Sequence, residues 1–186
     1  MRVLQILARE HAAIAECSRR FEAELESIAL RGEVDAEAVE RLLHFFEHEV
    51  DGHHQEKEER IFMPRLLSRA SGEDVQALRA MFADHGAQRS LLAQMRNQIE
   101  GITYGEPNSL EILTRAARKY LRAQRVHSRW EQATLFPMAT RVLGPRDDRA
   151  LLNGFARLDE IWGSSVWAAE RSLAEWLDQR RSLVPA

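Results

Sequence analysis

Apolar residues recur along this chain at intervals of three and four, which is the spacing of one face of an α-helix. Five segments carry such a stripe, with representative positions Leu7 and Phe21, Val39 and Phe46, Leu78 and Phe82, Leu113 and Tyr120, and Leu158 and Trp162. No segment alternates apolar and polar residues strongly enough to favour a β-strand. The pattern therefore predicts an all-α fold.

Glycine and proline cluster at four places, 31–32, 71–72, 101–107 and 144–145, where we expect the helices to break. Short connections between long helices favour an up-down-up-down four-helix bundle over residues 1–143. Residues 144–186 then form an additional fifth helix. Its apolar stripe, which includes Trp162 and Trp176, must pack on the bundle or form a homodimer interface, because an exposed patch of that length is unusual in a monomer.

Six histidines and glutamates interrupt the apolar stripes on the side that faces the core: His11, His54, Glu58, His85, His127 and Glu131. Each glutamate follows a histidine by four residues and so shares its helix face. A carboxylate in a core is costly unless it is paired or bound to metal. Imidazole and carboxylate together are good ligands for divalent cations. The set predicts a site for two cations with open coordination positions.

The second and fourth helices also share a repeated motif, in which glutamate comes four residues after histidine and proline comes ten after it. The two copies are His54–Glu58–Pro64 and His127–Glu131–Pro137. One copy would be weak evidence, since histidine and glutamate four apart are common on solvated helix faces. Two copies, with a lone inward histidine on each intervening helix, are much harder to obtain by chance.

These pieces, in this order and spacing, resemble the hemerythrin-like, or HHE cation-binding, family: Glu10-His11, His53-His54 with Lys57-Glu58-Glu59, Asp84-His85, and His127 to Glu131 with Leu135-Phe136-Pro137. The resemblance implies a four-helix bundle holding two iron ions in a non-haem di-iron centre, oxo- or hydroxo-bridged when oxidised. It implies His11, His54, His85 and His127 as terminal ligands. It implies Glu58 and Glu131 as the bridging carboxylates.

The chain departs from the oxygen-carrying hemerythrins at two positions. Those proteins place a further histidine one turn after the third-helix histidine, and this chain has Arg89 there. They also place an aspartate five residues after the fourth-helix histidine, whereas here Glu131 follows His127 by four. A four-histidine, two-glutamate set resembles instead that of bacterial iron–sulfur cluster repair proteins, which carry an extra N-terminal domain. Arg89 cannot bind metal because it stays protonated, and we expect it to pair with a carboxylate near the edge of the site.

Four residues are expected to support the site from outside the ligand set: His53, Arg89, Tyr120 and Gln124. His53 lies at the edge of the apolar face and is the best candidate for an extra ligand. We expect Tyr120 to be core packing with a hydrogen-bonded hydroxyl, and Gln124 to hydrogen-bond toward the site.

Other reactive residue types along the chain are interpreted as structural. His44 and His48 are expected to be solvated, and so is the charge run Glu56 to Arg60 apart from Glu58. Cys17 is expected to be buried and inert.

Composition excludes several classes of function. A net charge of -3 gives no basic footprint for nucleic acid, and no apolar run approaches the roughly 20 residues that cross a membrane. The first residues lack the apolar block of a signal peptide, so a cytoplasmic location is the default expectation. With one cysteine in the chain, any metal must be held by histidine and carboxylate.

Three functions remain open. The first is a di-iron protein that binds or senses O2, NO or peroxide at an open iron position. The second is a di-iron enzyme that acts on peroxide or NO, and the third is iron handling or cluster repair. A ferritin-like oxidase is disfavoured because no histidine has a glutamate three residues before it. A zinc hydrolase is disfavoured because His-Glu-x-x-His is missing. A purely structural bundle would leave the inward carboxylates unexplained.

Overall fold

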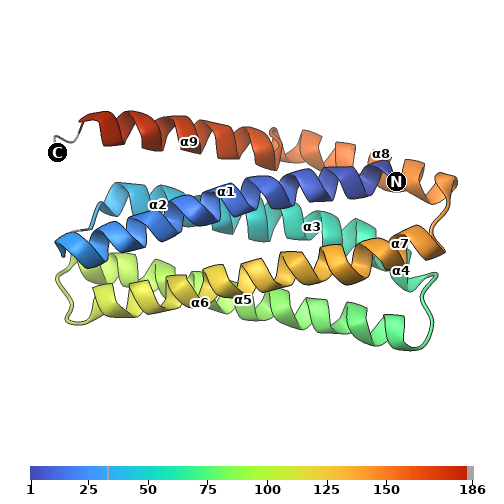
Figure 1. Ribbon diagram of the computed structural model, residues 1–186, viewed down its shortest axis with the longest axis horizontal. Helices are drawn as coiled ribbons and strands as arrows, with labels where there is room; N and C mark the ends of the chain where they lie inside the picture. The colour runs from blue at the N-terminus through green and yellow to red at the C-terminus, as the bar shows by residue number, and fades with distance from the viewer. Residues whose placement is uncertain (33, 184–186) are drawn as a thin grey trace.

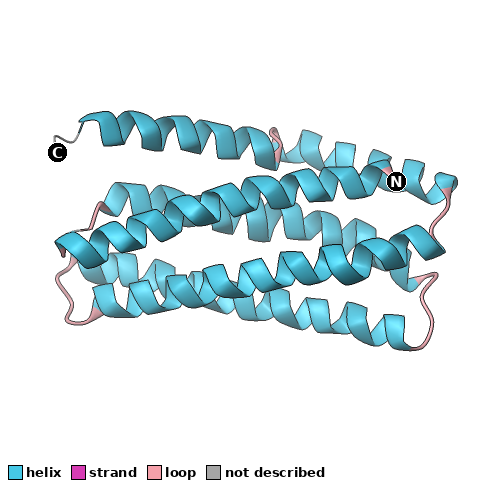
Figure 2. Ribbon diagram, viewed as in Figure 1, coloured by secondary structure: helices cyan, strands magenta, loops and turns pink. Residues whose placement is uncertain are grey.

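The structure is a computed structural model that describes residues 1–32 and 34–183, and these contain helices and no β-strand. Long helical stretches lie side by side, with connecting loops at opposite ends of the molecule (Figures 1 and 2). In chain order the elements are α1 (Arg2–Arg31), α2 (Ala36–Phe45), η1 (Phe46–His54), α3 (Gln55–Lys57), η2 (Glu58–Phe62), α4 (Met63–Leu67), α5 (Glu73–Thr103), α6 (Ser109–Trp130), η3 (Glu131–Leu135), α7 (Phe136–Val142), α8 (Pro145–Trp162) and α9 (Val166–Leu183). The predicted helical bundle is confirmed.

The helices end where the sequence placed glycine and proline. Gly32 adopts a left-handed conformation with φ 70°, and its N–H donates to the carbonyl of Ile28, which closes α1. Asp35 caps α2 by accepting a hydrogen bond from the N–H of Ala38 at 3.1 Å. Pro145 occupies the first turn of α8, where a missing N–H costs nothing. All four predicted breaks coincide with connections between helices.

The expected single fifth helix is wrong. Residues 145–162 and 166–183 form two helices, α8 and α9, separated at Gly163. Gly163 has φ 74°, a left-handed conformation that ends a helix, and its N–H donates to the carbonyl of Asp159 at 2.9 Å. α9 contacts α1 and α2, while α8 contacts α1 and η2, and Trp162 and Trp176 are partly buried. The last three residues of the predicted fifth helix, 184–186, lie outside the described residues.

The second and fourth stretches contain π-helical turns, η1, η2 and η3, that the sequence pattern did not predict. A π-turn inserts an extra residue into a helix and is often found at functional sites. His54 is the last residue of η1, Glu58 is the first of η2, and Glu131 is the first of η3. Three of the six predicted ligands therefore sit at irregular turns.

The core consists of two apolar clusters with a polar layer between them. One cluster includes Ile14, Phe46 and Tyr120, and the other includes Leu7 and Phe62. Within α1 the change from one cluster to the other falls at His11, between Leu7 and Ile14. In the described part of the chain, no helix is long and apolar enough to cross a membrane.

Candidate metal centre

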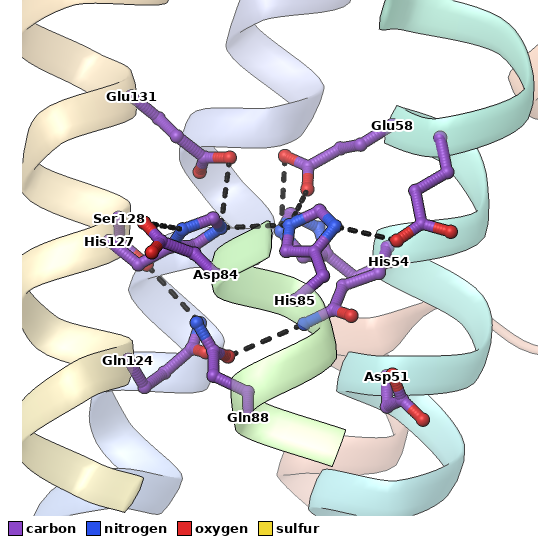
Figure 3. A network of polar contacts seen from close by, with 12 residues as sticks. Asp51, His54, Glu58, Asp84, His85, Gln88, Gln124, His127, Ser128 and Glu131 are labelled. Atoms are coloured by element: carbon purple, nitrogen blue, oxygen red, sulfur yellow. Dashed lines mark hydrogen bonds and ion pairs between the residues drawn. The ribbon is translucent and has the colours of Figure 1, made fainter. Parts of the chain in front are cut away.

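The structure brings the six predicted residues together in this polar layer. Each is at most 3% exposed, although they come from α1, η1, η2, α5, α6 and η3. Figure 3 shows Glu131 and Glu58 facing each other above His127 and His85. The six side chains form two groups of potential ligand atoms, each atom within 4.8 Å of the others in its group. One group holds His11 and His54, the other His85 and His127, and both glutamates belong to both groups.

Each glutamate directs its two oxygens toward different groups. Glu58 places Oε1 at 3.4 Å from His54 Nε2 and Oε2 at 3.4 Å from His85 Nε2. Glu131 places Oε2 at 2.8 Å from His11 Nε2 and Oε1 at 3.2 Å from His127 Nε2. This is the arrangement that a carboxylate needs in order to bridge two cations.

The polar atoms of this layer fit a metal better than they fit one another. Buried atoms without a hydrogen-bond partner among the described residues include Nε2 of His11 and His54, Oε2 of Glu58 and both oxygens of Glu131. The Nε2 atoms of His85 and His127 face each other at 2.9 Å, so at most one of them can carry the proton of that contact. Unsatisfied buried groups of this kind are rare, and cations bound within each group would satisfy them.

The buried histidines and carboxylates of the layer shift one another's pKa values. Burial alone would lower the pKa of His54, but the charge of Glu58 and the hydrogen bond to Glu10 raise it to about 9. Burial alone would raise the pKa of Glu131, yet its close polar contacts with His11 and His127 hold that pKa well below its usual range. Without metal, a proton on His54 offsets part of the carboxylate charge, and a bound cation would displace it.

The two groups differ in what supports them from outside. His54 Nδ1 lies 2.8 Å from Glu10 Oε2, and Glu10 is fully buried and also pairs with Lys57. His85 Nδ1 lies 2.8 Å from Glu59 Oε1, and Glu59 is a quarter exposed. Partners of this kind fix the orientation of a ligating imidazole and raise its basicity. The carboxylate behind His54 is thus buried, whereas the one behind His85 reaches solvent.

Arg89 turns away from the centre, as expected. Its guanidinium donates to Asp51 at 3.0 Å, to Glu59 at 3.1 Å and to Gln55 at 3.2 Å. The positive charge of Arg89 is therefore neutralised by carboxylates at the edge of the site. Its hydrogen bond to Glu59 links it indirectly to His85.

The other expected neighbours behave differently from one another. His53 does not join either ligand group; it contacts Asp159 at 2.7 Å and Glu49 at 3.5 Å. Gln124 is buried and donates to Ser128 at 3.3 Å, on the α6 face that leads to His127. Tyr120 packs against Phe46 as core, but its buried hydroxyl has no hydrogen-bond partner among the described residues, so the expected hydrogen bond is missing.

The interpretation of 56–60 as solvated apart from Glu58 is wrong for Lys57, which is fully buried. Its ammonium lies between Glu10 and Asp159, and each of these partners is distant in the sequence. The one available signal was spacing, because Lys57 follows His53 by one helical turn. By contrast His44 and His48 are exposed, and Cys17 is buried with a raised thiol pKa, mainly because of burial, as expected.

Two grooves lead from the surface to the polar layer. One, of about 330 Å³, lies between α1 and α6 and is lined by His11, Gln124 and Gln132 among others. The other, also about 330 Å³, lies between α5 and α6 and is lined by His127 and Gln88 among others. Each groove therefore ends on a histidine of a different group.

The comparisons with known proteins agree with this site. No curated protein and no solved structure matches the chain. A family model does match, over residues 2–139, which span all six residues of the two groups. The match is to the hemerythrin HHE cation-binding domain, and the chain belongs to this family.

Proposed function

We propose that this protein is a non-haem di-iron protein that binds or senses O2, NO or peroxide at an open coordination position. The observation that carries the proposal is the sharing of Glu58 and Glu131 between the two ligand groups. Two separate mononuclear sites would not need both carboxylates in common. A shared pair instead suits two cations held close together, with His11 and His54 on one and His85 and His127 on the other.

The donor set favours iron. Each cation would receive two imidazole nitrogens and two carboxylate oxygens, a mixture that suits iron, whereas thiolate-rich sets suit zinc or copper(I). Four protein ligands leave positions open on an ion that prefers six. When bound, an iron pair supplies redox chemistry toward small oxygen and nitrogen species.

The protein's own residues would then control access and environment. The apolar clusters on either side of the layer exclude bulk water from the site. The two grooves ending at His11 and His127 are large enough for small molecules. Their linings include polar side chains such as Gln124 and Gln88, which can hydrogen-bond a small polar ligand on its way to the site.

The first test is metal content. Protein loaded anaerobically with ferrous iron should hold two ions per chain, and a sample with one or none would refute the di-iron proposal. The His48→Ala variant is the control, because His48 is exposed and belongs to neither group.

The second test separates the functions. The protein is reduced under anaerobic conditions and then mixed with O2, and the near-ultraviolet spectrum is followed. Rapid, irreversible oxidation supports the sensing or reactive proposal, because Arg89 stands where oxygen carriers place a further histidine. A long-lived spectrum that reverses under vacuum would refute it in favour of oxygen carriage. Multiple turnovers of peroxide or NO would favour the enzyme, and transfer of iron to an acceptor protein would favour iron handling.

A further inference from the structure

A fully buried lysine lies close to the metal centre. Lys57 has no exposed surface, and its ammonium contacts Glu10 Oε1 and, at 2.6 Å, Asp159 Oδ1. The other oxygen of Glu10 lies 2.8 Å from His54 Nδ1. A continuous chain of polar contacts therefore runs from Asp159 through Lys57 and Glu10 to His54.

Asp159 comes from α8, beyond the residues 2–139 that match the family domain. It also lies 2.7 Å from His53 Nε2. The end of α8 is fixed beside it, because Trp162 stacks on His53 at a centroid distance of 5.3 Å and donates its Nε1–H to Glu56 at 2.9 Å. These contacts fix the end of α8, and with it Asp159, against the helical segment that carries Lys57.

The division of the lysine between two carboxylates matters for His54. A buried cation needs compensating charge, and here Glu10 and Asp159 share that role. Because Asp159 takes part of the ammonium's hydrogen bonding, Glu10 can use its second oxygen to accept from His54 Nδ1–H. If Asp159 were neutral, Glu10 would be the only carboxylate left to balance the charge of Lys57, and it would become a weaker acceptor for His54.

We propose that Asp159 is a positioning residue of the metal centre, which acts through Lys57 and Glu10 to orient His54 and strengthen it as a ligand. The proposal rests on the di-iron function proposed above. It assigns a role in the site to α8, and it predicts an effect on one cation of the two. The cation held by His85 and His127 is supported instead by Glu59 and should not respond.

The test is Asp159→Asn, which keeps the shape of the side chain and removes its charge. Variant and wild type are loaded anaerobically with ferrous iron, and iron release to an excess of a chromophoric chelator is followed. Loss of a partner behind a ligating histidine typically weakens metal binding by about 10–100-fold. Because Asp159 acts through two intermediates, we expect about 10-fold weaker retention of one ion and unchanged retention of the other. Glu160→Gln, at an exposed neighbour on α8, is the matched control and should change neither.

A double-mutant cycle separates positioning from simple packing of α8. Lys57→Met removes the link between Asp159 and Glu10, so Asp159→Asn should have no further effect on iron release in that background. An equal effect in both backgrounds would mean that Asp159 acts only by packing, and would overturn the proposal. Unchanged release from Asp159→Asn, in protein whose wild type holds two ions, would overturn it while leaving the di-iron function intact. A wild type that holds no iron would overturn both.

Discussion

Replacing Gly52 with alanine would push a methyl group into the ring of Trp162. Gly52 lies in η1, and a Cβ there would stand 2.5 Å from the Cη2 atom of Trp162 and 3.2 and 3.3 Å from the two neighbouring ring carbons. Real Cβ atoms do not approach other atoms this closely, so the ring or the helix must move.

The ring has little freedom to move. It stacks on His53 with an interplanar angle of 9°, meets His48 edge-on at 4.6 Å, and donates to Glu56. Overpacking of this kind costs about 1–3 kcal/mol. Loss of the hydrogen bond to Glu56 would add about 0.5–1.5 kcal/mol, and the better helix propensity of alanine would return about 0.5–1 kcal/mol. The net destabilisation is about 0.5–4 kcal/mol, which for a chain of this length lowers Tm by roughly 1–16 °C.

The assay is thermal unfolding of the metal-free protein followed by circular dichroism. The matched control is Gly86→Ala, in the middle of α5, where an added Cβ has no neighbour within 4 Å and stability should stay the same or rise. In a Trp162→Ala background, Gly52→Ala should lose most of its cost, because the obstructing ring is gone. If Gly52→Ala and Gly86→Ala unfold at the same temperature, the inferred close contact between α8 and η1 is wrong.

Three further predictions concern the polar layer. Glu58→Ala or Glu131→Ala should lose more iron than His48→Ala when measured by metal analysis, since each glutamate serves both cations; the reverse order would contradict the bridging assignment. The pKa of His54 is raised to about 9 in the metal-free fold, so its stabilising contribution is complete below its unfolded value near 6.5 and disappears as pH rises through 9. Bound metal replaces that proton, so the difference in Tm between loaded and metal-free protein should widen from pH 6.5 to 9. A constant difference would contradict the competition between this proton and the metal. Tyr120→Phe should leave the free energy of unfolding unchanged or raise it by about 1 kcal/mol at most, because it removes a buried hydroxyl that has no partner among the described residues. A lower unfolding temperature than that of the wild type would show that the hydroxyl is hydrogen-bonded.

The convergence of the six site residues could be predicted because each fact needed was local. A histidine placed three, four or seven residues from an apolar stripe stays on the same helix face, and four such faces meet in a bundle. The burial of Lys57 could not be predicted in this way, since its partners Glu10 and Asp159 lie on other helices far along the chain. A lysine within a run of charges looks solvated until those partners are known.

Two features of the backbone were missed for a related reason. The apolar stripe continues across Gly163 from Leu158 to Val166, and a lone glycine inside a helical pattern is often tolerated. The π-turns were missed because a spacing of four residues, as from His54 to Glu58, is compatible with both an α-turn and a wider one. In both cases the periodicity shows the face of the helix but not the exact path of its backbone.

The division of the core into two apolar clusters has a consequence for how a cation enters. Helices α1 and α5 contribute residues to both clusters and cross the polar layer in between, so either half can loosen while the other keeps these helices in place. The cluster that contains Leu7, Phe62 and Phe155 is the smaller one, and it is built partly from the short helices α4 and α7. Regions with fewer buried apolar contacts open at lower free energy. We therefore expect metal exchange to proceed by partial opening at this end, without global unfolding of the chain.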